Sequence, residues 1–158
     1  MATSRIQSYG RTIVLIPPVY VGLSLVFTAI LYVGFPTHSL WFFPANLVVS
    51  LFLITLGLSF VGMAFFQFKK QSTTKSFRRS SALVTDGCYR LTRNPMYLGL
   101  TLILLGISAG LGQPLTLLSP LFFFCVMNWM FIPYEEEKMS YEQGRAYLNY
   151  RNRVRRWL

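Results

Sequence analysis

Two long stretches of the chain carry no charged side chain. No Asp, Glu, Lys or Arg occurs from Thr12 to Phe68 or from Asn94 to Tyr134. A bilayer core takes roughly 20 apolar helical residues to cross, so each stretch is long enough for two crossings with a turn between them. The pattern therefore predicts four transmembrane helices, near residues 12–34, 45–68, 96–112 and 115–133.

The turns between these spans have their own signatures. Residues 34–44 contain Gly and Pro together with three successive aromatic residues, Trp41, Phe42 and Phe43, which we expect at the depth of the lipid headgroups. Gly and Pro also interrupt the second apolar stretch between positions 110 and 114, and together they end a helix and allow a tight reversal. The last two spans are therefore expected to form a hairpin.

The distribution of Lys and Arg predicts the orientation. The chain has 158 residues and a formal net charge of +10, with its basic residues before the first span, between the second and third spans, and after the fourth. Because basic loops stay in the cytoplasm, both termini and the central loop are expected there. We predict an all-α, multi-pass integral membrane protein, residues 1–158 forming a single domain, in the inner membrane if the source is bacterial.

Composition also argues against some partners. The basic residues flank hydrophobic spans without a DNA-binding or RNA-binding motif, so membrane lipids are the expected partner and nucleic acid is not. Cys88 and Cys125 match neither a disulfide framework nor a metal-ligand spacing, and no metal is expected. The pattern does not define an oligomeric state.

A first polar cluster, residues 87–99 with the sequence GCYRLTRNPMYLG, runs from the central loop into the third span. Asn94 followed by Pro95 is typical of a helix start, because an Asn side chain accepts a free backbone N–H and Pro lacks one. Arg90 and Arg93 add charge beside the partial positive charge of that helix end, which favours an anionic group such as a carboxylate.

The same segment offers other binding groups. Tyr89 and Tyr97 supply hydroxyls and ring faces, and Gly99 lets a backbone or a flat ligand approach closely. A simpler interpretation, a capped span with basic flanks, accounts for the same residues.

A second polar cluster leaves the fourth span at the same membrane face. Glu135, Glu136 and Glu137 follow Pro133 and Tyr134, and acids at the hydrocarbon boundary are costly unless they face a polar cavity or a partner. Acids in the first turn of a new helix are also favoured by its dipole, which is the simpler interpretation. Downstream residues at helical spacing predict one cytoplasmic amphipathic helix over residues 135–150, whose stripe consists of Met139, Gln143, Tyr147 and Tyr150.

Together these segments resemble the integral-membrane methyltransferases that include isoprenylcysteine carboxyl methyltransferase and phosphatidylethanolamine N-methyltransferase. The family pattern is Gly-x-Tyr-Arg, then Arg-(His or Asn)-Pro-x-Tyr-x-Gly opening a span, then Glu-Glu, Gly-x-x-Tyr-x-x-Tyr and a basic tail ending near Trp. The matching segments cover the second half of the chain in order and spacing, at residues 87–90, 93–99, 135–136, 144–150 and 154–157.

The resemblance implies an S-adenosylmethionine-dependent methyl transfer to a lipophilic substrate, with the cofactor enclosed by residues 83–158. Arg90 or Arg93 would bind the cofactor carboxylate, and Glu135 and Glu136 the ribose hydroxyls or the amino group. Tyrosines would enclose the nucleoside and the sulfonium. Arg93 and Glu136 are the expected catalytic pair, Glu136 serving as base if the acceptor is an amine. The remaining cofactor-binding residues are expected to be Tyr89, Asn94, Pro95, Tyr97, Gly99, Tyr147 and Tyr150.

Three departures from the family pattern leave the acceptor open. Asn94 stands where several members have His, Cys88 where Pro is common, and Gln143 where an aromatic residue is usual. An isoprenylated thiol or carboxylate and a lipid amine all remain candidates. Two other classes compete: a nicotinamide-dependent membrane reductase of similar architecture, although the chain lacks a glycine-rich dinucleotide fingerprint, and a non-enzymatic membrane adaptor.

Overall fold

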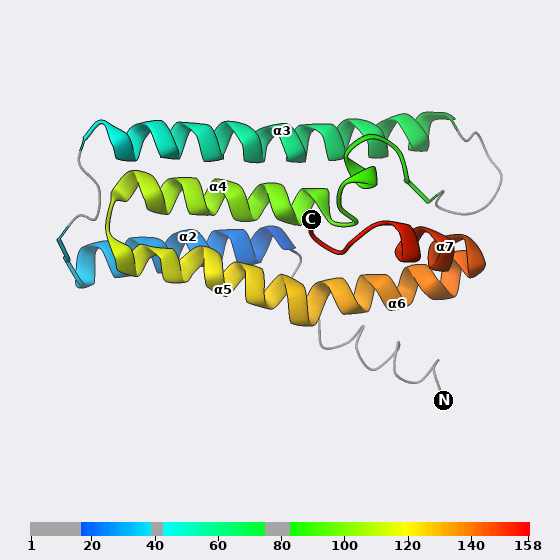
Figure 1. The fold of residues 1–158 in the computed structure, drawn as a ribbon. Coiled ribbons are helices and arrows are strands. Elements are labelled where there is room, and N and C mark those ends of the chain that lie inside the picture. Colours follow the sequence, from blue (N-terminus) through cyan, green and yellow to red (C-terminus); the bar gives the residue numbers. More distant parts are fainter. Residues whose placement is uncertain (1–16, 39–42, 75–82) are drawn as a thin grey trace.

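The protein is a bundle of helices (Figure 1). A computed structural model describes residues 17–38, 43–74 and 83–158, and this part of the chain contains helices and turns but no strand. The α-helices are α2 (Pro17–Gly34), α3 (Ala45–Thr74), α4 (Pro95–Leu111), α5 (Leu118–Val126), α6 (Ile132–Gln143) and α7 (Arg145–Arg153). Three shorter segments lie between them: the 3₁₀ helices η1 (Gly87–Arg90) and η2 (Pro114–Leu117), and the π-helical turn η3 (Met127–Phe131).

The helices confirm the predicted all-α membrane protein. Three are long and apolar enough to cross a bilayer, namely Pro17–Gly34, Ala45–Lys70 and the continuous stretch Pro114–Gln143. The apolar α4 is shorter, at 17 residues, and lies between α3 and the other two in the bundle (Figure 1). Residues 12–16 of the first predicted span, Trp41 and Phe42 of the aromatic turn, and the basic residues Arg5, Arg11, Lys75, Arg78 and Arg79 lie outside the described residues.

Small residues bring α3 and α4 into close contact. A Cβ atom built on Gly99 would lie 2.6 Å from the carbonyl oxygen of Gly57, and one built on Gly106 would lie 3.0 Å from that of Ser50. Glycine is therefore needed on both sides of this interface, as in other membrane helix pairs where small residues let backbones approach. Helix α4 is thereby fixed along its length, and so is its first turn at the site.

The helix of the fourth predicted span continues past residue 133. Helix α5 passes through the π-helical turn at Met127–Phe131 directly into α6, so that one continuous rod leaves the membrane region and carries the glutamates (Figure 1). The predicted single helix over residues 135–150 is wrong, because Gly144 adopts φ of 55° and divides it into α6 and α7. This positive φ is one that glycine adopts readily and other residues rarely do, and the helix ends there.

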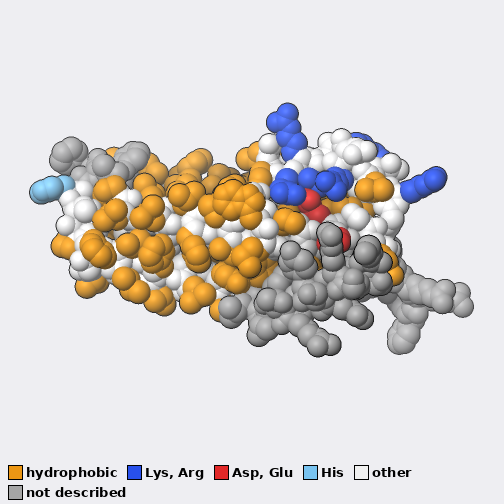
Figure 2. All heavy atoms as spheres, turned by 90° about the horizontal axis from the view of Figure 1, so that it is seen from below, with side chains coloured by type: hydrophobic (Ala, Val, Ile, Leu, Met, Phe, Trp, Pro, Cys, Tyr) orange, Lys and Arg blue, Asp and Glu red, His pale blue; other side chains and the backbone are white. Residues whose placement is uncertain are grey.

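Charge and apolar surface occupy different ends of the molecule. Apolar side chains cover the length of the bundle, whereas the basic and acidic side chains visible in this view gather at one end, and His38 lies at the other (Figure 2). The charged end contains the start of α4, α6, α7 and the C-terminal residues. This segregation is the pattern of an integral membrane protein with one strongly basic face.

Candidate functional site

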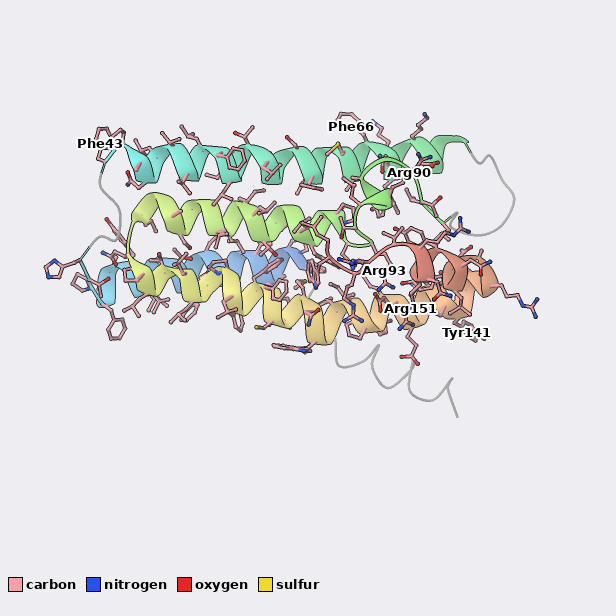
Figure 3. All side chains as sticks on the ribbon, viewed as in Figure 1. Phe43, Phe66, Arg90, Arg93, Tyr141 and Arg151 are labelled. Atoms are coloured by element: carbon pink, nitrogen blue, oxygen red, sulfur yellow. The ribbon has the colours of Figure 1, made fainter. Side chains whose placement is uncertain are left out.

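The candidate site lies at the charged end, where three segments meet. These are residues 92–97 at the start of α4, the first turns of α6, and the C-terminal residues 155–157, which return from α7 to the start of α4 (Figure 1). Figure 3 shows Arg93 between the beginning of α4 and the α6–α7 pair. The hairpin of the last two spans thus brings the two polar clusters to one side, as the sequence predicted.

At its centre is an arginine–glutamate cluster, which we define as Arg93, Glu136 and Arg156. Arg93 Nη1 lies 3.0 Å from Glu136 Oε1, and the two side chains are only 10% and 9% exposed. Arg156 donates from Nη2 to Glu136 Oε2 at 2.8 Å and from Nε to Oε1 at 3.3 Å. One buried carboxylate therefore holds two guanidinium groups, leaving one positive charge in excess.

Arg93 retains unused donors. Its Nε and Nη1 atoms are buried and make no hydrogen bond of acceptable geometry with any described group, although Nη1 contacts Glu136. Buried donors of a charged group are seldom left without an acceptor. The arrangement thus suits an additional anionic ligand, such as a carboxylate.

The C-terminal residues are tied to the start of α4 through the backbone. The Arg156 carbonyl oxygen accepts hydrogen bonds from Thr92 Oγ1 and Asn94 Nδ2, both at 3.0 Å, and the Arg155 carbonyl accepts one from the Arg93 N–H at 3.0 Å. Trp157 donates to Asn128 Oδ1 at 3.0 Å. The tail is therefore part of the site.

The predicted capping role of the Asn94 side chain is wrong. Helix α4 begins at Pro95 with Asn94 at the N-cap position, as predicted, but the Asn94 side chain makes no capping hydrogen bond to the described backbone. Its amide group donates to the tail instead, and the backbone N–H of Asn94 donates to Thr92 Oγ1 at 3.2 Å. The polar side chain at this position joins two segments of the site.

The tyrosines surround the arginine–glutamate cluster. Tyr97 donates to Glu135 Oε1 at 2.8 Å, and Tyr150 donates to the Tyr89 carbonyl at 2.7 Å. Burial, with smaller contributions from Cys88 and Glu135, raises the pKa of Tyr89 to about 12. The pKa of Tyr147 is raised by burial and by Glu136, while the nearby Arg93 guanidinium partly opposes the shift. These phenols stay protonated at neutral pH, and the hydroxyls of Tyr97 and Tyr150 act as hydrogen-bond donors.

A glycine and a glutamine hold the loop that precedes α4. Gly87 has φ of 59°, and a Cβ atom there would overlap the Gln67 side chain of α3. With its amide oriented to satisfy both neighbours, Gln67 donates to the Asp86 carbonyl at 2.7 Å and accepts from the Cys88 N–H at 3.3 Å. Gly87 of the Gly-x-Tyr-Arg segment is thus required by backbone conformation and by this contact.

Two predicted site residues are not brought into the cluster. Arg90 is exposed and pairs with Asp86 at 3.0 Å on the surface near α3 (Figure 3), which leaves Arg93 as the buried arginine of the pair. Gly99 faces Gly57 and Val61 of α3, so its close approach is to another helix. Pro95, in contrast, is buried at the start of α4 beside the cluster.

The sequence interpretation missed Arg156, Asn128 and Trp157 as individual residues. The basic tail ending near Trp was the signal that contained two of them, but no spacing pointed to Asn128. Trp157 also stacks on Phe124, with ring centroids 4.7 Å apart. This ring contact joins the C-terminal residues to α5.

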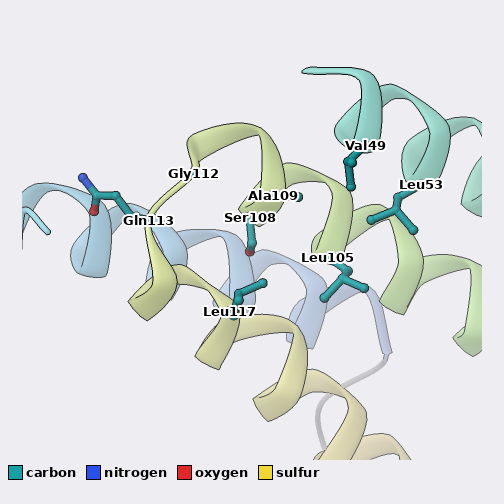
Figure 4. A pocket seen from close by; sticks show the side chains of 8 residues that line it. All are labelled: Val49, Leu53, Leu105, Ser108, Ala109, Gly112, Gln113 and Leu117. Carbon is teal, nitrogen blue, oxygen red and sulfur yellow. The ribbon is translucent and has the colours of Figure 1, made fainter. Parts of the chain in front are cut away.

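A separate apolar pocket lies at the opposite end of the bundle (Figure 4). It has a volume of about 240 Å³ and lies between α3, α4 and the turn before α5, with Val49, Leu53, Leu105 and Leu117 among its lining residues. It is remote from Arg93 and its lining carries no ionisable side chain, so it is not part of the candidate site. Within the described ranges, no group of three or more His, Cys, Asp or Glu residues is placed to hold a metal ion.

Comparison with known proteins assigns the chain to a family. A model of the phospholipid methyltransferase family matches residues 45–144, from the start of α3 to the turn after α6. The chain belongs to the phospholipid methyltransferase family. The match includes Arg93, Glu135 and Glu136 and ends before Tyr147 and Arg156.

Relatives of this family member include Protein-S-isoprenylcysteine O-methyltransferase B of Arabidopsis thaliana. It is 36% identical over 76 residues, which cover 46% of this chain and 36% of the relative. Protein-S-isoprenylcysteine O-methyltransferase A of the same plant is 34% identical over 83 residues, covering 50% and 40%. An uncharacterized protein of Haemophilus influenzae is 41% identical over 63 residues, 40% of this chain and its own whole length. The matches thus span well under half of the two Arabidopsis proteins. No solved structure gives a significant match.

Proposed function

We propose that this protein is an S-adenosylmethionine-dependent methyltransferase whose acceptor is a lipophilic molecule dissolved in the membrane. The observation that carries the proposal is the buried Arg93, whose Nε and Nη1 make no hydrogen bond with described groups, beside a carboxylate shared with Arg156. Membership of the phospholipid methyltransferase family and the two isoprenylcysteine O-methyltransferase relatives support the reaction class.

The residues present fit the chemical groups of the cofactor. S-adenosylmethionine has a carboxylate, an amino group, a sulfonium and a nucleoside, and when bound it supplies an activated methyl group. Arg93 would hold the carboxylate through its open donors. Glu135, positioned by Tyr97, is the better of the two acids for the amino group or the ribose hydroxyls, and the rings of Tyr89, Tyr147 and Tyr150 would enclose the nucleoside.

Glu136 is better suited to orienting arginines than to removing a proton. Both of its carboxylate oxygens are engaged by guanidinium groups, so neither oxygen is free of a partner to accept a proton from a substrate. An acceptor that arrives as a carboxylate or thiolate needs no base, since alignment of the reacting atoms supplies most of the catalysis. We therefore propose that Arg93 and Glu136 act by binding and alignment.

We also propose that the charged end faces the cytoplasm, as the basic residues predict. The described part of that end includes Arg145, Arg151 and Arg153 of α7, whereas His38 lies at the other end. Single cysteines placed at His38 and at Arg153 of a variant without Cys88 and Cys125, labelled in intact cells with a membrane-impermeant reagent, test this orientation. Labelling at position 153 rather than position 38 would contradict it.

The function is tested by titrating S-adenosylmethionine into the purified, detergent-solubilised protein in a calorimeter. Saturable binding with one site per chain is expected, and no heat from the reduced nicotinamide cofactors. Incubation of membrane extract with methyl-labelled cofactor, followed by mass spectrometry, then identifies the acceptor. Absence of saturable binding by a folded sample would refute the proposal.

A further inference from the structure

The two arginines hold Glu136 in different ways. Arg156 meets the carboxylate edge to edge, with Nη2 to Oε2 at 2.8 Å and Nε to Oε1 at 3.3 Å. Arg93 contributes a single contact, from Nη1 to Oε1 at 3.0 Å, that lacks hydrogen-bond geometry among the described groups. A guanidinium that pairs edge to edge fixes a carboxylate more tightly than a single contact does. Arg156 therefore determines how Glu136 is oriented.

Hydrogen bonds hold the backbone of Arg156, from which the guanidinium extends, in one position. Its carbonyl oxygen accepts hydrogen bonds from Thr92 and Asn94 on the α4 side, and its Nη1 reaches the Asn128 carbonyl of the π-helical turn at 3.5 Å. The following residue, Trp157, is bound to the side chain of the same Asn128. These contacts hold the guanidinium against the Glu136 carboxylate.

The arrangement has a consequence for Arg93. Without Arg156, the buried Glu136 carboxylate would have one guanidinium partner, Arg93. An edge-to-edge pair between them would use the Arg93 Nε, which now has no acceptor, in addition to the existing Nη1 contact. An arginine paired in this way would keep other N–H donors, but its Nε edge would be occupied and its charge compensated by Glu136, which leaves it a weaker partner for a second carboxylate.

We propose that Arg156 is a positioning residue that holds Glu136 in an edge-to-edge pair and so limits Arg93 to a single contact with this carboxylate, which leaves the Arg93 Nε donor available to the carboxylate of the cofactor. This inference rests on the proposed function. It predicts that Arg156 affects affinity for the carboxylate of the cofactor and for no other part of it.

The experiment measures binding to the full chain of two ligands, S-adenosylmethionine and decarboxylated S-adenosylmethionine, which lacks only the carboxylate. For Arg156→Gln we expect the affinity for S-adenosylmethionine to fall about 10- to 100-fold, the range for a lost charge-assisted hydrogen bond. The affinity for the decarboxylated ligand should stay at the wild-type value. Arg156→Lys, which keeps the charge without the paired donors, should give an intermediate loss.

A second substitution separates positioning from folding. Glu136→Gln in the Arg156→Gln background removes the carboxylate that would neutralise Arg93, so affinity for S-adenosylmethionine should recover by about tenfold or more. Arg153→Gln, which changes an exposed arginine of the same helix end, is the matched control and should behave as wild type.

Three results would overturn the inference: equal losses for both ligands in Arg156→Gln, no loss for either, or no recovery in the double variant. The wild-type titration keeps the two proposals distinguishable. A wild-type protein that fails to bind S-adenosylmethionine overturns the proposed function, whereas wild-type binding with any of those three results overturns only the role of Arg156.

Discussion

The side chain of Asn94 and the backbone of Arg156, 62 positions apart in the sequence, are joined by a hydrogen bond of 3.0 Å. The bond links the first turn of a membrane span to the C-terminal residues of the chain. Because Thr92 donates to the same carbonyl oxygen, the tail is held at one point by two side chains. The position of the Arg156 guanidinium depends on that attachment.

Asn94→Ala should loosen the tail without unfolding the bundle. The substitution removes one of the two hydrogen bonds to the Arg156 carbonyl, an interaction worth about 1 kcal/mol, and leaves the start of α4 at Pro95 intact. Hydrogen exchange at the Arg93 amide, which donates to the Arg155 carbonyl, should become faster. Asn152→Ala, at an exposed position of α7, is the control, and equal exchange in both variants would contradict the attachment.

Gly99→Ala should destabilise the protein. Its new methyl group would lie 2.6 Å from the Gly57 carbonyl oxygen, and forcing α3 and α4 apart costs about 1 to 3 kcal/mol for a methyl group in a packed interface. Unfolding in mixed detergent measures the loss. Gly62→Ala is the matched control on α3, because a Cβ atom there meets nothing within 4 Å; a comparable loss in the control would refute the packing explanation.

Arg93→Gln and Arg90→Gln should differ in cofactor binding. Arg93 is buried with open donors, so its loss should weaken binding of S-adenosylmethionine by about 100-fold, the upper range for a hydrogen bond to a charged group. Arg90 pairs with Asp86 on the surface, and its loss should leave binding at the wild-type value. Calorimetry on both variants measures this, and the reverse order would show that the wrong arginine has been assigned.

Alkaline pH should destabilise the protein partly through Tyr89. Its folded-state pKa of about 12 lies above the ordinary value of 10.0, so the unfolded chain releases this proton at lower pH than the folded protein. The free energy with which this group stabilises the folded protein is therefore fully present below pH 10 and is lost as the pH rises toward 12. The pKa of Tyr150 is also raised by burial.

Thermal unfolding followed from pH 8 to 11.5 tests this expectation, with pH values chosen to bracket the ordinary tyrosine pKa of about 10. The melting temperature should fall above that pKa, and Tyr89→Phe should show a shallower fall. Tyr32→Phe, which alters an exposed tyrosine near the opposite end of the bundle, should follow the wild-type curve. An unchanged slope in Tyr89→Phe would exclude Tyr89 as a contributor.

The sequence predicted the spans and the meeting of the two polar clusters because both follow from strong physical constraints. Hydrocarbon excludes charge, so the charge-free stretches mark the helices, and a short turn between the last two spans brings their far ends together. The start of α4 was predicted for a local reason, the Asn94–Pro95 pair. None of these predictions needed knowledge of side-chain packing.

The remaining features depend on contacts between distant parts of the chain. The helical period of the stripe ending in Tyr150 continues across Gly144, so periodicity alone did not reveal the break. Arg90 and Arg93 are chemically identical, and only the turn between them decides which is buried. Arg156 joins the cluster through backbone contacts with residues around Asn94, for which no local pattern exists.

The unbroken rod formed by α5, the π-helical turn and α6 bears on how ligands enter. Because Glu135 and Glu136 are extensions of a helix embedded in lipid, they share its rigid-body position and have no loop about which to swing. Spin labels at Leu121 and Lys138, both exposed, should accordingly keep one separation with and without S-adenosylmethionine. Any rearrangement around the site is therefore expected on the opposite side, where side-chain hydrogen bonds from Thr92 and Asn94 join the returning chain end to the start of α4.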